Sequence, residues 1–145
     1  MNTDIFSPKT FDKAHYDAVC NLMCQLTTRS IVFSPEDYLQ LLESSSSKLF
    51  LLLCEDSVVG MLTVGMYASP TGTKAWIEDV VVDESLRGSG LGRVLVEHAL
   101  DFCKESGIDT VYLTSNPKRI AANGLYQSVG FVRKDTNMYK LDLNK

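Results

Sequence analysis

The sequence of 145 residues contains no long apolar run and no surplus of basic residues. No stretch approaches the ~18 consecutive apolar residues that cross a membrane. The first residues, MNTDIFSPKTFDKAH, lack the basic and then apolar pattern of a secretory signal, so we expect a cytoplasmic protein with no membrane partner. Fourteen basic against eighteen acidic residues give a net charge of −4, which argues against a nucleic-acid partner.

Cysteine and histidine are too few and too scattered for a metal centre. The chain has four cysteines and two histidines, and the cysteines do not form the paired CxxC hooks of a structural zinc site. We therefore expect no metal. The cysteines all lie in apolar-patterned segments, which is typical of buried free thiols in a reducing compartment: Cys20, Cys24, Cys54 and Cys103.

The composition of the chain is that of an ordinary globular protein. Apolar residues make up 45% of it and charged residues 22%, which excludes disorder as the dominant state. No internal repeat is visible. The length suits one domain, and we expect a single domain over residues 1–145.

Apolar periodicity and helix-end signals divide the chain into helices and strands. Ser34-Pro35 followed by two acids is typical of a helix start, and Gly107 suits the end of a long helix. The predicted helices cover 14–26, 34–42, 90–105 and 120–128, and the predicted strands cover 49–54, 58–67, 75–82, 110–114, 131–133 and 138–143. This order predicts an α/β (α+β) fold, a mixed sheet with helices packed on its faces.

The most informative segment joins an apolar strand to the long helix. Glycines at 88, 90 and 92 alternate in the connection, between Arg87 and Arg93. The first N–H groups of a helix lack intrahelical partners and carry partial positive charge. Glycine lets an anion approach them closely, and each arginine adds a full charge. The segment therefore has the features of a pyrophosphate-binding loop.

Two common phosphate-binding motifs do not fit this loop. A P-loop ends in Gly-Lys-Ser/Thr, whereas Gly92 is followed by Arg93 and Val94. A dinucleotide fold needs GxGxxG and an acid at the end of the next strand. Here the spacing is GxGxG, and the next strand ends Thr114-Ser115-Asn116 without an acid.

The sequence resembles the GNAT superfamily of acetyl-CoA-dependent N-acetyltransferases. Arg87, Gly90 and Gly92 match its Gln/Arg-x-x-Gly-x-Gly/Ala signature. A second family feature, a helix with a tyrosine followed by Gly-Phe, is matched by the segment 121–126 and by Gly130-Phe131. The order of the predicted elements agrees with the family fold over nearly the whole chain, so the resemblance implies one N-acetyltransferase domain over residues 1–145.

The resemblance implies how acetyl-CoA is bound as co-substrate. The strand before the loop splays from its parallel neighbour at 111–114, which frees backbone groups for the pantetheine arm and the acetyl carbonyl. The loop binds the pyrophosphate, and Asn123 contacts the pantetheine. The implied cofactor-binding residues, besides Asn123, are Val80, Val81, Val82, Arg87, Gly88, Ser89, Gly90, Leu91, Gly92 and Arg93.

Two side chains are candidates for proton transfer. The resemblance places the hydroxyl of Tyr126 at the thioester sulfur, and a phenol is a suitable acid for a departing thiolate. Glu78 is the candidate base, on the same side of its strand as Val80 and Val82 if no bulge intervenes. Asp79, its neighbour on the opposite face, stays open as an alternative.

The acceptor is the least determined part of the prediction. The resemblance implies a small-molecule or peptide amine, and homodimerisation is compatible with the family. Many members carry Asn at the position of Arg119, which puts the usual contact there in doubt and suggests that Arg119 approaches a cofactor phosphate. The family surrounds its acceptor pocket with segments that here contain Tyr16, Phe33, Tyr38 and Tyr67. The alternative function is a catalytically silent CoA-binding module with the same fold.

Overall fold

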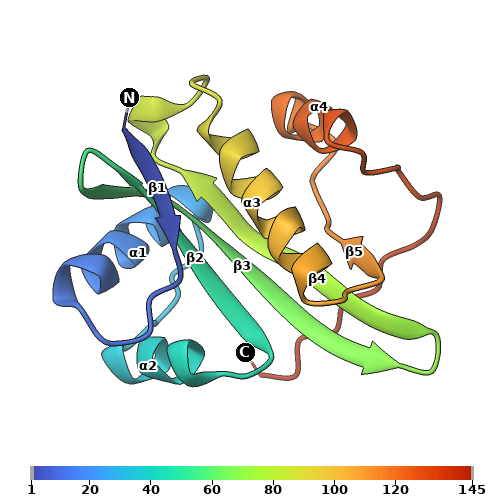
Figure 1. Ribbon diagram of the computed structural model, residues 1–145, viewed down its shortest axis with the longest axis horizontal. Coiled ribbons are helices and arrows are strands. Elements are labelled where there is room, and N and C mark those ends of the chain that lie inside the picture. The colour runs from blue at the N-terminus through green and yellow to red at the C-terminus, as the bar shows by residue number, and fades with distance from the viewer. Residues whose placement is uncertain (1, 145) are drawn as a thin grey trace. The chain divides into compact units, whose positions relative to one another are not determined.

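The computed structural model describes residues 2–144 as two compact units. The chain passes from the first unit to the second between Thr114 and Ser115. The first unit contains a sheet with three α-helices, and the second contains one helix and the C-terminal segment (Figure 1).

The sheet of the first unit has five strands in the order β1-β2-β3-β4-β5. The pairs from β1 to β4 are antiparallel, and β4 pairs with β5 in parallel. The strands are β1 Thr3–Phe6, β2 Ser47–Cys54, β3 Ser57–Ser69, β4 Gly72–Val82 and β5 Thr110–Tyr112. The mixed, mostly antiparallel sheet confirms the predicted fold class. The sequence patterns did not indicate β1, a four-residue strand that pairs with the second half of β2.

The first two helices begin at residues whose side chains cap them. Asp12 accepts a hydrogen bond from the His15 N–H at the start of α1 (Lys13–Leu26). Ser34 and Asp37 form a reciprocal capping box at the start of α2 (Pro35–Glu43), which confirms the predicted start. A short 3-10 helix, η1 (Glu84–Leu86), precedes α3 (Leu91–Glu105). Gly107 has a φ of 74°, as expected for a glycine that ends a helix.

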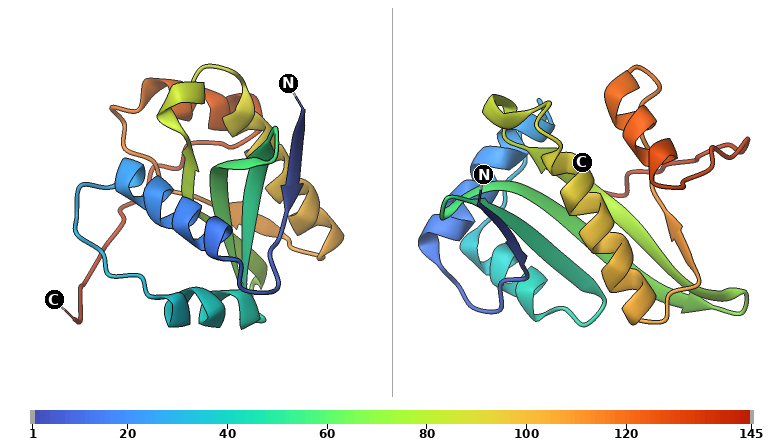
Figure 2. Two further views of the ribbon diagram at one scale, coloured as in Figure 1. Left: turned by 90° about the vertical axis from the view of Figure 1, so that its left-hand side faces the viewer. Right: turned by 45° about the horizontal axis from the view of Figure 1, so that its top comes forward.

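Helices cover both faces of the sheet (Figure 2). α1 and α2 pack on one face, where the core consists of Val19, Leu22, Tyr38, Leu49, Leu51, Met61 and Val81. α3 packs on the other face, where Phe50 meets the rings of His98 and Phe102 at 5.0 and 5.2 Å. Gly60 lies under α3, and a Cβ at this position would stand 3.1 Å from Leu95. The close approach of α3 to β3 therefore depends on glycine.

The second unit differs from the sequence prediction. Its helix α4 (Ile120–Ser128) has the predicted bounds. The strands predicted at 131–133 and 138–143 are wrong, because residues 131–144 form neither helix nor strand. Their apolar side chains are at least 67% exposed at Val132, Met138, Tyr139, Leu141 and Leu143. Alternating apolar residues become a strand only when a neighbouring strand satisfies their backbone groups, and here no ladder forms.

Candidate active site

The two parallel strands of the sheet separate halfway along β4. Ladder pairing with β5 runs from Lys74–Thr110 to Trp76–Tyr112. At that end the rings of Trp76 and Tyr112 stack, with centroids 5.2 Å apart. β5 then ends, while β4 continues to Val82. On the edge of β4 that faces β5, the last six residues of β4 therefore form no strand-to-strand pairs within the described residues. The predicted splay is confirmed.

A β-bulge lies in this open half of β4. Met61 of β3 pairs with Val81 of β4, and Thr63 pairs with Glu78. The two β3 residues are two positions apart and their β4 partners are three apart, so β4 contains one extra residue. Asp79 has a φ of 52°, a left-handed conformation that is uncommon outside glycine and that aspartate adopts more readily than most residues.

The bulge changes the face on which Glu78 lies. Met61 and Thr63 are two residues apart on β3, so their partners Val81 and Glu78 share a face. That face carries α1 and α2, because Val81 belongs to the core beneath them. Glu78 was expected to share a face with Val80 and Val82 only if no bulge intervened, and the bulge removes that condition.

The surroundings of the Glu78 carboxyl raise its pKa. Glu78 lies at an exposed position. Partial desolvation, and secondarily the charge of Asp79, raise its pKa above the ordinary value of 4.5. A raised pKa brings a carboxylate closer to neutral pH, where a general base works best. Asp79 is exposed on the bulge itself.

The loop after β4 is tied to α1 by Gln25, a residue that the sequence reasoning missed. The Gln25 amide donates to the carboxylate of Asp83 at 3.3 Å and accepts from the N–H of Glu84 at 2.8 Å. Asp83 also accepts from the N–H and hydroxyl of Ser85 at 3.0 and 2.6 Å. The hydroxyl of Ser85 is the main reason why the pKa of Asp83 lies below its usual value. No motif in the sequence pairs Gln25 with this loop, because the contact is formed only by packing.

The glycine-rich turn before α3 is open to an approaching group. Gly88 and Gly90 have φ values of 83° and 84°, and within the described residues no heavy atom lies within 4 Å of a Cβ added to either. Gly90 is the N-cap of α3, and within the described residues no side-chain hydrogen bond caps this end of the helix. The first N–H groups of α3 have no intrahelical partners, and the two glycines beside them carry no side chain. A glycine-lined helix N-terminus of this kind can accept an anionic group such as a phosphate.

Both arginines of the loop contact the protein as well as solvent. Arg87 donates from Nε to the carbonyl of Val82 at 3.3 Å, which braces the turn against the end of β4. Arg93 donates from Nε to Glu97 at 3.1 Å, and its side chain is 47% exposed.

The second unit contains the remaining predicted site residues on α4. Asn123 uses its amide N–H groups to bind the carbonyls of Asn116 and Arg119, each at 2.8 Å, and so braces the start of the helix. Tyr126 is only 6% exposed, and its ring packs edge-on against Phe131 at 6.1 Å. Burial raises the pKa of Tyr126, and the Arg119 guanidinium partly opposes this effect.

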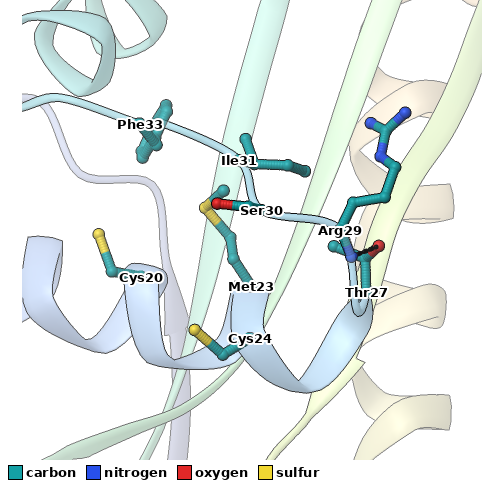
Figure 3. A pocket seen from close by; sticks show the side chains of 8 residues that line it. All are labelled: Cys20, Met23, Cys24, Thr27, Arg29, Ser30, Ile31 and Phe33. Carbon is teal, nitrogen blue, oxygen red and sulfur yellow. Dashed lines mark hydrogen bonds between the residues drawn. The ribbon is translucent and has the colours of Figure 1, made fainter.

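A pocket of about 210 Å³ lies beside the C-terminal half of α1 (Figure 3). Its walls come from α1 and from the loop that leads to α2, and they are formed by Cys20, Met23, Cys24, Thr27, Arg29, Ser30, Ile31 and Phe33. Of the aromatic residues expected near an acceptor, Phe33 lines this pocket, and Tyr16 stacks on Phe33 with centroids 6.2 Å apart.

The described part of the chain contains neither a metal-binding cluster nor a membrane-spanning helix. Among residues 2–144, no group of three or more His, Cys, Asp or Glu side chains could hold a metal ion. No helix in that range has the length and apolar character needed to cross a bilayer.

The sequence model of the acetyltransferase (GNAT) family matches residues 16–131. The match covers most of the chain, including the splayed β4, the glycine-rich turn and α4. The chain therefore belongs to the GNAT acetyltransferase family.

Individual relatives agree with this assignment. Over 84 residues the chain is 33% identical to the mycothiol acetyltransferase of Renibacterium salmoninarum, a match that covers 57% of this chain and 25% of that protein. Over 58 residues it is 36% identical to the [ribosomal protein bS18]-alanine N-acetyltransferase of Escherichia coli K12, which covers 40% of this chain and 39% of that protein. The chain thus spans less than half the length of these curated relatives.

The fold also agrees with solved structures. An aminoglycoside acetyltransferase from an uncultured soil metagenomic sample, solved in complex with trehalose, superposes with a TM-score of 0.83. The match covers 99% of this chain and 97% of that one, with 21% identity. At this identity the likeness concerns the fold.

Proposed function

We propose that this chain is an N-acetyltransferase that moves an acetyl group from acetyl-CoA to a primary amine. The observation that carries the proposal is the turn at Gly88 and Gly90, which opens the start of α3 directly after the unpaired half of β4. Membership of the GNAT family supports the same reaction.

The first unit contains the residues that would hold the co-substrate. Backbone groups of 80–82 would bind the pantetheine arm, since β4 has no ladder partner there on the side of β5 within residues 2–144. The N–H groups of 87–93, with the charges of Arg87 and Arg93, would bind the pyrophosphate. Bound acetyl-CoA supplies an activated acetyl thioester.

Glu78 and Tyr126 would move the protons. An ammonium group must lose a proton before nitrogen can attack, and the raised pKa of Glu78 suits its carboxylate to take that proton, directly or through water. The hydroxyl of Tyr126 would donate a proton to the departing sulfur. Because burial raises the pKa of Tyr126, the phenol stays protonated at neutral pH and is available as an acid.

The two compact units would act together as one acetyltransferase domain. The family match runs from residue 16 to residue 131 and so includes both sides of the division after Thr114. The proposed acceptor is a small-molecule or peptide amine. The names of the relatives, a mycothiol acetyltransferase and a ribosomal-protein alanine N-acetyltransferase, are compatible with either kind. We also propose a homodimer, which light scattering during size-exclusion chromatography would test.

The proposal is tested by incubating the purified chain with acetyl-CoA and pooled amines. The pool contains amino acids, peptides, polyamines, amino sugars and aminoglycosides, and mass spectrometry detects the acetylated product. We expect acceptor-dependent release of the CoA thiol, absent when the pool is omitted. Binding of acetyl-CoA without acetylation of any pool member from pH 6 to pH 10 would instead support the silent CoA-binding module.

A further inference from the structure

The pocket beside α1 contains one cation and no carboxylate. Arg29 is the only one of its eight lining residues that carries a full charge at neutral pH. Among residues 2–144, no acidic side chain forms an ion pair with the guanidinium of Arg29. Two other cations of the first unit, Lys13 and Arg93, do have such partners, at 2.8 Å from Asp17 and 3.1 Å from Glu97. Arg29 therefore offers its hydrogen-bond donors to a ligand.

The rest of the pocket is largely apolar. Met23 and Phe33 are partly buried along it, and Ile31 is 44% exposed at its edge. In Figure 3 Met23 and Ile31 lie between Cys20 and Phe33 at one end of the pocket and Arg29 at the other. The volume of about 210 Å³ is below the roughly 300–1,000 Å³ of pockets for drug-sized ligands. It suits one apolar side chain rather than a large molecule.

The pocket lies on the elements that adjoin the proposed reaction centre. α1 packs on the sheet face that carries Val81 and Glu78. The same helix contacts the loop after β4 through Gln25, which lies one residue beyond the pocket-lining Cys24. An acceptor bound along α1 would therefore be on the same face of the sheet as the proposed base.

We propose that the acceptor is an amine that also bears a carboxylate and an apolar side chain, with the carboxylate bound by Arg29 and the side chain held against Met23, Ile31 and Phe33. This inference rests on the proposed acetyl transfer and names its substrate class. Free amino acids and short peptides share this chemistry. Polyamines and aminoglycosides do not, because Arg29 repels their positive charges.

The kinetic test compares leucine, leucinamide, the dipeptide alanyl-leucine and spermidine as acceptors of the full chain with saturating acetyl-CoA. A charge-assisted hydrogen bond lost at an accessible site lowers affinity by about tenfold. We expect kcat/KM for leucine or for the dipeptide to exceed that for leucinamide by about this factor, and spermidine to be the poorest acceptor. Whichever of leucine and the dipeptide is preferred identifies the source of the carboxylate.

Variants of Arg29 connect this preference to the pocket. Arg29→Gln should raise KM for leucine, so that the ratio of kcat/KM for leucine to that for leucinamide falls to about one. Arg29→Lys should keep most of this ratio. Arg133→Gln, which removes an exposed arginine of the second unit, is the matched control and should change nothing. A binding readout avoids catalysis: 4-methylpentanoate, which has no amine, should bind the CoA-loaded chain in calorimetry, about tenfold more weakly after Arg29→Gln.

The outcomes separate this inference from the proposed function. Equal rates with leucine and leucinamide, or preference for spermidine, would overturn the carboxylate inference while acetyl transfer stands. Binding of 4-methylpentanoate that depends on Arg29, without acetylation of any amine, would support the pocket and contradict acetyl transfer. Binding of this probe that is unaffected by Arg29→Gln, or absent at millimolar concentration, would overturn the inference.

Discussion

Replacement of Gly90 by alanine tests the proposed cofactor site most directly. Gly90 has a φ of 84°, and no heavy atom of the described chain lies within 4 Å of a Cβ built there. The methyl group therefore causes no clash, and its cost in the free protein is the left-handed backbone alone, about 1–2 kcal/mol. For a chain near 150 residues this lowers Tm by about 2–8 °C.

Gly107→Ala is a matched control for this cost. Gly107 has a φ of 74° and equally open space around its Cβ, but it lies at the opposite end of α3. Both variants should therefore lose a similar amount of stability without ligand. Only at Gly90 would the new methyl group stand where the pyrophosphate approaches the helix N-terminus.

The assay is thermal unfolding with and without acetyl-CoA. Ligand at a hundredfold excess over Kd stabilises the protein by about 2.7 kcal/mol, which raises Tm by about 5–10 °C. If Gly90→Ala weakens binding a hundredfold, the stabilisation falls to about 0.4 kcal/mol and the shift to about 1–2 °C. Gly107→Ala should keep the full shift. Equal ligand-induced shifts in the two variants would refute the placement of the cofactor at this turn.

Further predictions concern the proton-transfer residues and the loop contact. Tyr126→Phe should lower kcat by about 10²–10⁴ with little change in acetyl-CoA affinity, and an unchanged kcat would reduce Tyr126 to a packing role. Glu78→Gln should lower kcat/KM most near neutral pH and least at high pH, where the amine arrives neutral; wild-type kinetics from pH 6 to pH 10 would favour Asp79 or water as the base. Because the pKa of Glu78 is raised in the folded state, ionisation there costs stability as pH rises above its ordinary value. Glu78→Gln should therefore raise Tm at pH 7 and not at pH 3, and a gain independent of pH would contradict the shift. Gln25→Ala removes the hydrogen bonds to Asp83 and Glu84 and should lower the free energy of unfolding by about 1 kcal/mol and weaken acetyl-CoA binding. No change in either quantity would show that this contact is unimportant.

The parts of the fold that the sequence predicted are those with local causes. The start of α2 follows from Ser34 and Pro35, and the end of α3 from Gly107, because each residue favours its helix end without help from distant parts of the chain. The glycine-rich turn was found for the same reason, since its arginines and glycines are contiguous.

Features that depend on distant partners were missed or wrongly predicted. β1 is four residues long, too short for a clear pattern, and is defined by its pairing with β2. Tyr139, Leu141 and Leu143 alternate as in a strand, yet they are exposed and unpaired within the described chain. Arg29 was not singled out, because only the path of the loop between α1 and α2 brings it to Phe33 and Met23.

The bulge in β4 shows why the position of the candidate base required a structure. Its extra residue is revealed only by the register against β3, where Thr63 pairs with Glu78 and Met61 with Val81. Aspartate adopts a positive φ more often than most residues but still rarely, so the residue type of Asp79 does not by itself predict a bulge. The bulge reverses the alternation and puts Glu78 on the face that α1 covers. A base on that face requires an acceptor that approaches along α1, which is where the pocket containing Arg29 lies. If Glu78 is the base, one inserted residue therefore decides that the acceptor approaches β4 on the face covered by α1, while the proposed co-substrate site is the glycine-rich turn at the end of the same strand.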